Sequence, residues 1–408
     1  MSDDRHDPYQ ALRFPEFRWF LAGVVTLTMG TQIQTLVMGW QVYHITHDPL
    51  SLGLIGLSEA IPFLTLALFG GWMADREDRR TIGLLTTSLL LLGGGSLLVL
   101  NARGLVDSAW PFYAIQAFAG VARAFNRPAT LALSTELVPR EAYQNGTTWR
   151  SSSMQMAQIT GPALGGLLYG FGSAVIAYSA EVVLMAFAFF ALLHIRPRPR
   201  QGTQGPVLKS LTEGVVFVFT RRVILGALSL DLFAVLFGGG VAMLPVFAAD
   251  ILRVGPQGLG VLRAAPAVGS VAMGLWLAHH PPRKRAGWVL LACVAGFGLC
   301  WAAFALTPWF VPALLLLFAS GCMDAVSMVL RGTLVQMSTP PEMMGRVQAV
   351  NGFFIGSSNE VGSFESGVAA RLLGVVPSVV FGGLMTLGVV GVIGWRVPEL
   401  RRLKRITG

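Results

Sequence analysis

Long apolar runs alternate with short polar connections over the whole chain. Twelve of these runs are long enough to cross a bilayer, because about 17 to 25 apolar residues in a helix span its hydrocarbon core. A run such as 81–100 is continuously apolar, whereas a β-barrel would show alternation within segments of about ten residues. The pattern therefore predicts an all-α integral membrane protein with helices at 17–43, 50–73, 81–101, 109–132, 144–171, 173–195, 223–250, 256–278, 286–306, 308–335, 345–370 and 375–397.

The second half of the chain repeats the first at a nearly constant offset. Gly161 recurs 201 positions later as Gly362, and a shift of 204 positions aligns Pro62 with Pro266. Parallel repeats of this kind are typical of transporters in which one half rocks against the other around a site near the middle of the membrane.

The longest polar connection lies between the two repeats. It contains several residues that break helices, namely Pro197, Pro199, Gly202, Gly205 and Pro206. We therefore expect an N-terminal six-helix half at 1–195, a cytoplasmic linker at 196–222 and a C-terminal six-helix half at 223–408.

Basic residues are concentrated in every second connection. Of the 30 Lys and Arg, the loops on one side of the predicted membrane hold only Arg103, Arg253 and Arg371. By the positive-inside rule, this bias predicts a multi-pass protein of the bacterial inner membrane with both termini in the cytoplasm. The net charge of +9 is spread over all the inner loops, so we expect no nucleic-acid partner. The expected surroundings are the lipid bilayer, and the expected state is a monomer.

The composition supports a membrane protein and offers little for cofactor chemistry. Hydrophobic residues make up 53% and charged residues 12% of the chain, and the mean hydropathy is +0.62. The three Cys and six His form no set with metal-ligand spacing. There is no G-x-x-x-x-G-K-[ST] phosphate loop, which argues against an ATPase. We therefore expect no metal, no cofactor and no enzymatic activity.

Three motifs carry a resemblance to a known family. The segment 70–80 (GGWMADREDRR) resembles the loop G-x-x-x-D-R-x-G-R-[RK] of the major facilitator superfamily, with Asp78 in place of the usual second glycine. The segment 161–166 (GPALGG) is similar to the GPxxGG signature of its drug:proton antiporters. The segment 357–367 resembles a pattern of the bacterial branch that contains the enterobactin exporter and macrolide efflux proteins. The resemblance covers the whole chain and implies two pseudo-symmetric six-helix halves.

The first motif predicts a cytoplasmic gate made by Asp75, Arg76, Arg79 and Arg80. Asp75 follows the predicted helix 50–73 and can meet a helix N-terminus or a guanidinium group, forming a latch that breaks when the halves rock. The alternative is a charged loop that only obeys the positive-inside rule. That alternative explains the three arginines but does not require Asp75.

The second motif predicts a special helix contact. Gly161, Pro162, Gly165 and Gly166 remove side-chain bulk, and the proline removes one backbone donor in mid-helix. Both a gating kink and simple close packing of two helices are consistent with this pattern.

Charged residues within the predicted crossings are the strongest functional signal. An unpaired charge at mid-bilayer costs at least about 2.5 to 3.5 kcal/mol on insertion scales, so each should face protein, a partner or a wet cavity. The repeat aligns Glu59 with Arg263 and Arg123 with Asp324, in each case with opposite sign. The complete set is Glu59, Arg123, Arg127, Arg150, Glu181, Asp231, Arg263, Asp324, Arg331, Glu360 and Glu365.

Two interpretations of these charges remain open. They either form buried salt bridges that hold the helices in register, or at least one carboxylate takes up and releases a proton. By resemblance, the first, fourth, seventh and tenth helices line a central cavity, which makes substrate-cavity candidates of Gln32, Gln34, Arg123, Arg127, Asp231, Arg331 and Asn359. Asp324 is the first proton-coupling candidate, because it should lie near mid-membrane on a cavity helix. Glu59, Glu360 and Glu365 follow, on predicted helices that meet at the junction between the halves.

These features predict a secondary active transporter with a small-molecule substrate and protons as its partners. The favoured function is proton-driven export of a siderophore-like or other amphipathic molecule by alternating access, since an apolar cavity with several cations suits a partly anionic aromatic compound. One alternative is efflux of macrolide-like drugs, and another is import or uniport by the same fold. A membrane enzyme or lipid-handling protein would need a nucleophile with a base, or a metal cluster, and we find neither in the sequence.

Overall fold

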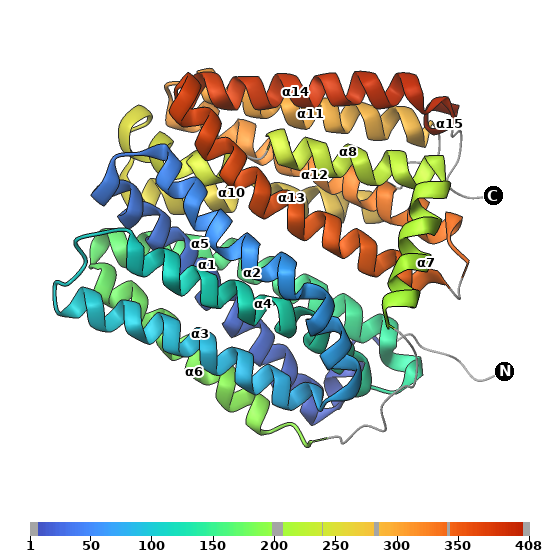
Figure 1. Cartoon of the computed structure of the whole chain (residues 1–408), viewed down its shortest axis with the longest axis horizontal. Coiled ribbons are helices and arrows are strands. Elements are labelled where there is room, and N and C mark those ends of the chain that lie inside the picture. Colours follow the sequence, from blue (N-terminus) through green and yellow to red (C-terminus); the bar gives the residue numbers. More distant parts are fainter. Residues whose placement is uncertain (1–6, 198–206, 239, 281–284, 341–342, 403–408) are drawn as a thin grey trace. The chain divides into compact units, whose positions relative to one another are not determined.

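The computed structural model describes residues 7–197, 207–238, 240–280, 285–340 and 343–402. All regular structure in these ranges is helical, and they contain no strand (Figure 1). By their contacts, the residues form two compact units, which are described in turn.

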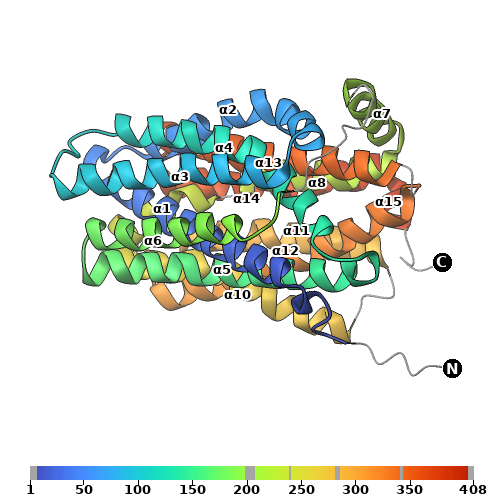
Figure 2. The same ribbon diagram turned by 90° about the horizontal axis from the view of Figure 1, so that it is seen from below.

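The first unit comprises Met1–Met38 and Ile61–Gln204. It holds most of α1 (Pro15–Thr46), the second half of α2 (Pro49–Arg76), and the whole of α3 (Arg79–Ala102), α4 (Trp110–Glu136), α5 (Tyr143–Phe171) and α6 (Ala174–Leu193). Helix α3 packs against both α4 and α6, as Figure 2 also shows for the chain seen from below. Asp78 caps the start of α3 by accepting a hydrogen bond from the Thr81 backbone amide (3.0 Å).

The second unit comprises Gly39–Ala60 and Gly205–Gly408. It holds the end of α1, the start of α2, and then α7 (Val207–Thr220), α8 (Arg222–Gly238), η3 (Gly240–Met243), α9 (Leu244–Val246), η4 (Phe247–Ile251), α10 (Gly255–His279), α11 (Ala286–Leu306), α12 (Phe310–Ser338), α13 (Met344–Leu373), α14 (Val375–Arg396) and α15 (Pro398–Arg402). Helix α12 packs against α10 and α11, and α14 packs against α8 and α11.

Every predicted helix has observed helical structure at nearly the same residues, and the described residues contain α7 and α15 as further helices. Nine helices among the described residues are both long and apolar enough to cross a membrane; α4, α5 and α13 carry more polar residues. Twelve membrane crossings therefore remain a prediction. At the predicted helix 223–250, the structure has α8 up to Gly238, followed by η3, α9 and the π-helix η4. Together these elements form one candidate membrane span, Arg222–Ile251, so the predicted crossing is observed with changes of helical type along its length.

The predicted linker also differs from the structure. Its described part contains α7, a helix of 14 residues, although the flanking glycines and prolines suggested a break in helical structure. The breaking residues lie almost entirely before α7, and residues 198–206 lie outside the described part of the chain. The contacts place α7 in the second unit together with 39–60, so the six-helix halves at 1–195 and 223–408 stay a prediction.

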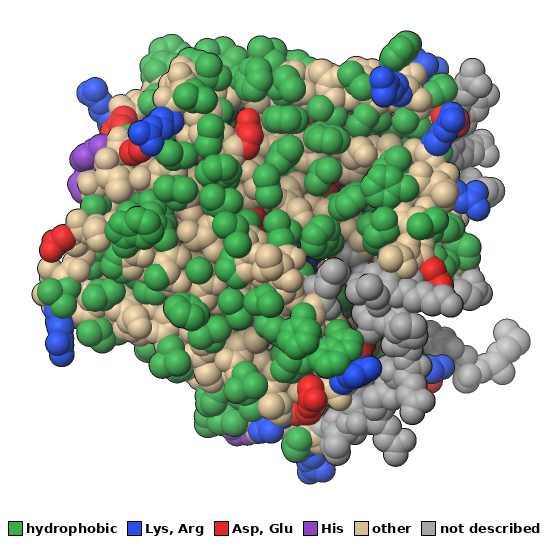
Figure 3. Space-filling model, viewed as in Figure 1, with side chains coloured by type: hydrophobic (Ala, Val, Ile, Leu, Met, Phe, Trp, Pro, Cys, Tyr) green, Lys and Arg blue, Asp and Glu red, His purple; other side chains and the backbone are tan. Residues whose placement is uncertain are grey.

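The outer surfaces of the helices are apolar. In the view of Figure 3, hydrophobic side chains cover the helices along most of their length. On α3, the exposed Leu85, Leu92 and Val99 recur at intervals of seven residues, and α6 exposes Val183 and Phe187. A stripe with this spacing runs along one face of a helix, as expected for a face in contact with lipid.

Candidate transport site

Three charged side chains meet between α8 and α12 in the second unit. Arg331 on α12 forms an ion pair with Asp231 on α8, and its Nη2 lies 3.9 Å from Asp324 Oδ1 on its own helix. Asp324 and Arg331 are seven residues apart, which places them on nearly the same face two turns apart. The Asp231 and Arg331 side chains are only 11% and 10% exposed, whereas the Asp324 side chain is 46% exposed.

The two carboxylates of this group contact Arg331 to different extents. The guanidinium of Arg331 is occupied on one side by Asp231, and its Nε donates a hydrogen bond to the Ser327 carbonyl (3.3 Å). Asp324 contacts Arg331 only through the longer 3.9 Å approach, and its partly exposed carboxylate is accessible to other partners. The three side chains together carry a formal charge of −1, so one added proton at Asp324 makes the group neutral, and the ionised carboxylate accepts hydrogen bonds from donors.

Two other arginines that the sequence predicts to line a substrate cavity lie in the first unit. Arg123 and Arg127 are four residues apart on α4, where Arg123 is half-buried and Arg127 is exposed. The two guanidinium groups are close enough to repel each other. From α1, Gln34 is buried, and Gln32 lies beside the position where a side chain on Gly161 would project.

The remaining carboxylate candidates gather on α2 and α13 in the second unit. Gly53 lies against the α13 backbone, where an added Cβ would be 3.2 Å from the Ser363 carbonyl oxygen. Close to this contact, Glu59 is buried (6% exposed), and Glu360 lies within electrostatic reach of the half-buried Arg263. The structure therefore brings Glu59 and Glu360 to two helices in direct contact.

Two further candidates on α13 take less protected positions. Glu365 is half-buried. Asn359 is exposed, and its Nδ2 donates a hydrogen bond to the Ile355 carbonyl of its own helix (2.8 Å). The part of the chain that the structure describes contains no group of three or more His, Cys, Asp or Glu residues placed to hold a metal ion.

The predicted gate loop is organised around Arg79. This side chain is buried, donates to the Ala74 carbonyl (3.2 Å) and pairs with Glu136 at the end of α4 (2.7 Å). Asp75 is more distant, with its Oδ1 4.0 Å from Arg79 Nη2, and its side chain is 55% exposed. Arg79 does not belong to a fully solvated basic loop, because a buried guanidinium group requires partners such as the Ala74 carbonyl and the Glu136 carboxylate.

The other two predicted gate arginines, Arg80 and Arg76, make different contacts. Arg80 donates hydrogen bonds to the carbonyls of Leu192 (3.1 Å) and Leu193 (3.2 Å) at the end of α6. This pairing satisfies carbonyl groups that have no partner inside their own helix. Arg76 is exposed and stacks over the Trp72 ring at 4.5 Å.

The GPALGG segment packs α5 against α1. Pro162 lies within α5, and Gly161, Pro162, Gly165 and Gly166 are all buried. A Cβ on Gly161 would lie 2.6 Å from Gln32 Cβ, and one on Gly165 would lie 3.2 Å from Ile33 Cα. Close packing of two helices therefore accounts for the glycines at these positions.

The structure also contains contacts that the sequence reading missed. In the second unit, the Tyr43 hydroxyl donates to the Asp250 carboxylate, and Arg371 pairs with Asp48 at 3.4 Å. Glu136 was missed as the partner of Arg79. No local pattern marks such pairs, since their members lie far apart in the sequence.

The long apolar helices and the charged groups held between them define a multi-pass membrane transporter. The model of the Major Facilitator Superfamily matches residues 20–363, and the chain belongs to this family, whose members are transporters of small molecules.

Curated relatives and solved structures agree with this assignment. The enterobactin exporter EntS of Shigella flexneri is 27% identical over 402 residues, which cover 96% of this chain and 94% of the relative. The nucleoside transporter NupG has a similar fold, with a TM-score of 0.72 at 14% identity and coverage of 95% of this chain and 99% of that one. A D-xylose–proton symporter gives the same TM-score, identity and coverage. The predicted major facilitator fold is confirmed.

Proposed function

We propose that this transporter is a proton-driven exporter of a siderophore-like, amphipathic molecule. The observation that carries the proposal is the group formed by Asp231, Arg331 and Asp324, in which one carboxylate is committed to a buried ion pair and the other is open. The 27% identity to an exporter of enterobactin over nearly the whole chain supports a substrate of related chemistry.

The open carboxylate of Asp324 couples proton and substrate by competition. An ionised carboxylate only accepts hydrogen bonds, so it binds the hydroxyl donors of a catechol or phenol. A proton on Asp324 takes up one acceptor position and removes the negative charge that strengthens those bonds. Export then follows if the proton displaces the substrate on the outer side and leaves on the inner side.

Arg331 compensates the charge of Asp231 when Asp324 is protonated. With Asp324 protonated, Asp231 and Arg331 remain as a neutral pair, so no isolated charge is left between the helices. Arg123 and Arg127 supply positive charge for a partly anionic ring system, and Gln32 and Gln34 supply neutral polar groups. Glu59, Glu360 and Glu365 form a second set of coupling candidates, of which Glu360 lies within electrostatic reach of Arg263.

We further propose a placement in the bacterial inner membrane as a monomer, with both termini and the 196–222 connection in the cytoplasm. The asymmetry of basic residues between alternate loops supports this orientation. In this orientation, the loop with Asp75 and Arg79 lies on the cytoplasmic side, and the connection between α1 and α2 lies on the opposite side.

Transport by proteoliposomes with an imposed pH gradient tests the proposal. Asp324→Asn should lose uphill accumulation of a radiolabelled catecholate siderophore while keeping downhill exchange, because the amide binds no proton. The matched control, Glu77→Gln, removes an exposed carboxylate in the gate loop and should behave like the wild type. Full uphill transport by Asp324→Asn would contradict the proposal for this residue. Accumulation of a macrolide but not of the siderophore would contradict the proposed substrate class.

A further inference from the structure

The first unit contains a buried carboxyl group that is not among the coupling candidates named above. Glu181 on α6 is completely buried (0% exposed). Neither of its carboxylate oxygens has a hydrogen-bond partner among the described residues. No part of the mechanism proposed above uses this side chain.

The surroundings of Glu181 are shaped to accommodate a carboxyl group but not a charge. Gly94 of α3 faces it directly, and a Cβ there would collide with Glu181 Oε1 and come within 3.1 Å of Cδ. From α1, Gly30 approaches the same turn of α6, where its Cβ would lie 3.4 Å from the Glu181 carbonyl oxygen. Tyr178, one turn earlier on α6, lies within electrostatic reach of Glu181 and is also completely buried.

An ionised Glu181 would be a buried charge without compensation. Burying a carboxylate is costly unless it is paired and hydrogen-bonded, and the described part of the chain offers it no cation. A metal cation needs several ligands, and the described residues contain no cluster of acidic, histidine or cysteine side chains that could supply them. A proton is the one cation that a single carboxyl oxygen can hold alone.

We propose that Glu181 is a proton-binding site within the first unit, loaded and unloaded along the seam between α3 and α6. Its role in transport rests on the proton-driven function proposed above, whereas proton binding itself does not. Ionisation of Glu181 would require α3 and α6 to separate enough to admit water, so loss of the proton is linked to a rearrangement of this unit.

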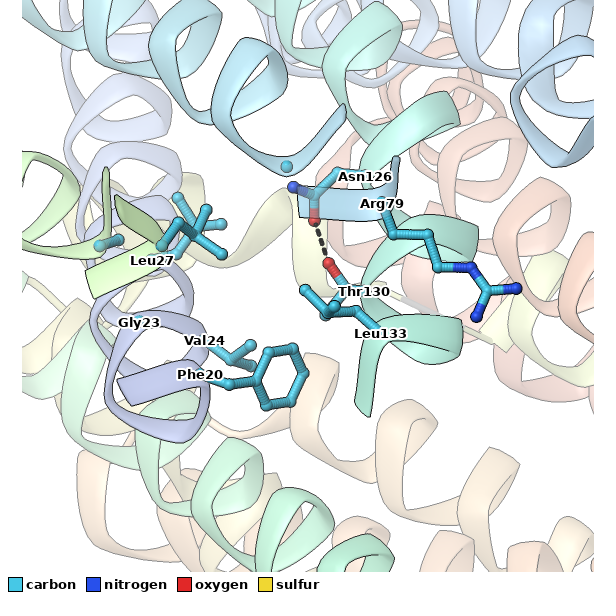
Figure 4. Close-up of a pocket in the computed structure, with 11 residues that line it drawn as sticks. Phe20, Gly23, Val24, Leu27, Arg79, Asn126, Thr130 and Leu133 are labelled. Carbon is cyan, nitrogen blue, oxygen red and sulfur yellow. Dashed lines mark hydrogen bonds between the residues drawn. The ribbon is translucent and has the colours of Figure 1, made fainter. Parts of the chain in front are cut away.

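A small cavity with three polar side chains, Arg79, Asn126 and Thr130, lies at one end of this seam. The cavity, of about 20 Å³, lies between α1, α3, α4 and α6, and Figure 4 shows the hydrogen-bonded Asn126 and Thr130 side by side on α4, with Arg79 beside them. That volume accommodates about one water molecule. Thr130 donates to Asn126 (3.1 Å), and Asn126 donates to Thr86 (2.8 Å).

The seam continues from the cavity towards Glu181. Gly83 and Leu192 line the cavity, and Gly94 lies eleven residues further along α3, or roughly 16 Å at the helical rise. Thr87 is completely buried between these levels, and its hydroxyl has no partner among the described residues. Arg79 lies at the end of the seam that is cytoplasmic in the proposed orientation.

Infrared spectroscopy of the purified protein in nanodiscs tests the site directly. A protonated carboxyl group gives a C=O stretching band that shifts when its proton is replaced by deuterium. We expect wild-type protein at neutral pH to show such a band, Glu181→Gln to show it with clearly lower intensity, and Glu77→Gln to show it unchanged. Glu181→Gln should also unfold at the same temperature as the wild type, because the neutral amide resembles the neutral acid in shape.

A band of unchanged intensity in Glu181→Gln would overturn the proposal. A marked fall in its unfolding temperature would do so as well, since that result would show that an ionised Glu181 is needed to hold the fold. The seam is tested by the rate of the deuterium shift, which should slow in Thr130→Val, a variant that keeps the side-chain shape and removes the cavity hydroxyl. An unchanged rate would overturn the route along the seam. These readouts need no transport, so failure of the Asp324 proposal would leave them unaffected.

Discussion

The substitution Asp231→Asn probes how much the buried ion pair contributes to stability. Both side chains of the pair are about nine-tenths buried, so neutralising Asp231 leaves the Arg331 guanidinium poorly compensated. Breaking a buried pair typically costs about 3 to 5 kcal/mol. Because Asp324 remains 3.9 Å from Arg331 as a weaker second partner, we expect the lower value, about 3 kcal/mol. This corresponds to a fall of roughly 6 °C in the unfolding temperature of a unit of this size.

The assay is thermal unfolding in detergent, followed by tryptophan fluorescence. The control is Glu213→Gln, which breaks the pair between Glu213 and Arg346, whose side chains are 41% and 37% exposed. An exposed pair contributes about 0 to 1 kcal/mol, so this variant should unfold close to the wild type. In the double variant Asp231→Leu/Arg331→Leu, the loss should be smaller than the sum of the two single losses. If Asp231→Asn were no less stable than Glu213→Gln, the reasoning would be refuted.

Three further predictions concern the gate, the α5 motif and the orientation. Asp75→Asn should slow transport in vesicles without loss of substrate binding, and an unchanged rate would remove the latch role from this exposed residue. Gly161→Ala should destabilise the protein by about 1 to 3 kcal/mol, because the added methyl group clashes with Gln32. The control Gly95→Ala should not destabilise it, since nothing lies within 4 Å of the added methyl group. Equal unfolding temperatures of the two variants would contradict the packing argument. In a variant whose three native cysteines are replaced, a membrane-impermeant maleimide should label Asp107→Cys but not Glu77→Cys in intact cells, and the reverse would invert the proposed topology.

Sequence reasoning predicted the helices because each apolar run must bury its own backbone hydrogen bonds in lipid, which makes membrane helices largely local. It did not predict the changes of helical type within 223–250, where α8 is followed by the 3₁₀-helix η3 and the π-helix η4. It noted Asp78 only as a departure from the family loop, whereas the side chain caps α3. Hydropathy does not distinguish an α-helix from the other helical types.

The candidate site was predicted only in part for a related reason. The spacing of Asp324 and Arg331 within one helix is visible in the sequence, but their meeting with Asp231 depends on how α8 packs against α12. Likewise, Glu181 stood among the predicted intramembrane charges, yet nothing in the sequence shows that it lies against Gly94 with no partner among the described residues. Contacts between distant helices are set by tertiary packing, which a single sequence does not reveal.

The central claim is that proton and substrate compete for Asp324. Binding of a catecholate ligand to the purified protein in weakly buffered solution, at a pH where Asp324 is partly protonated, should release protons that a pH-sensitive dye detects. Asp324→Asn should bind the ligand with little or no proton release, while Glu77→Gln should release protons as the wild type does. Equal proton release by the wild type and Asp324→Asn would contradict the claim.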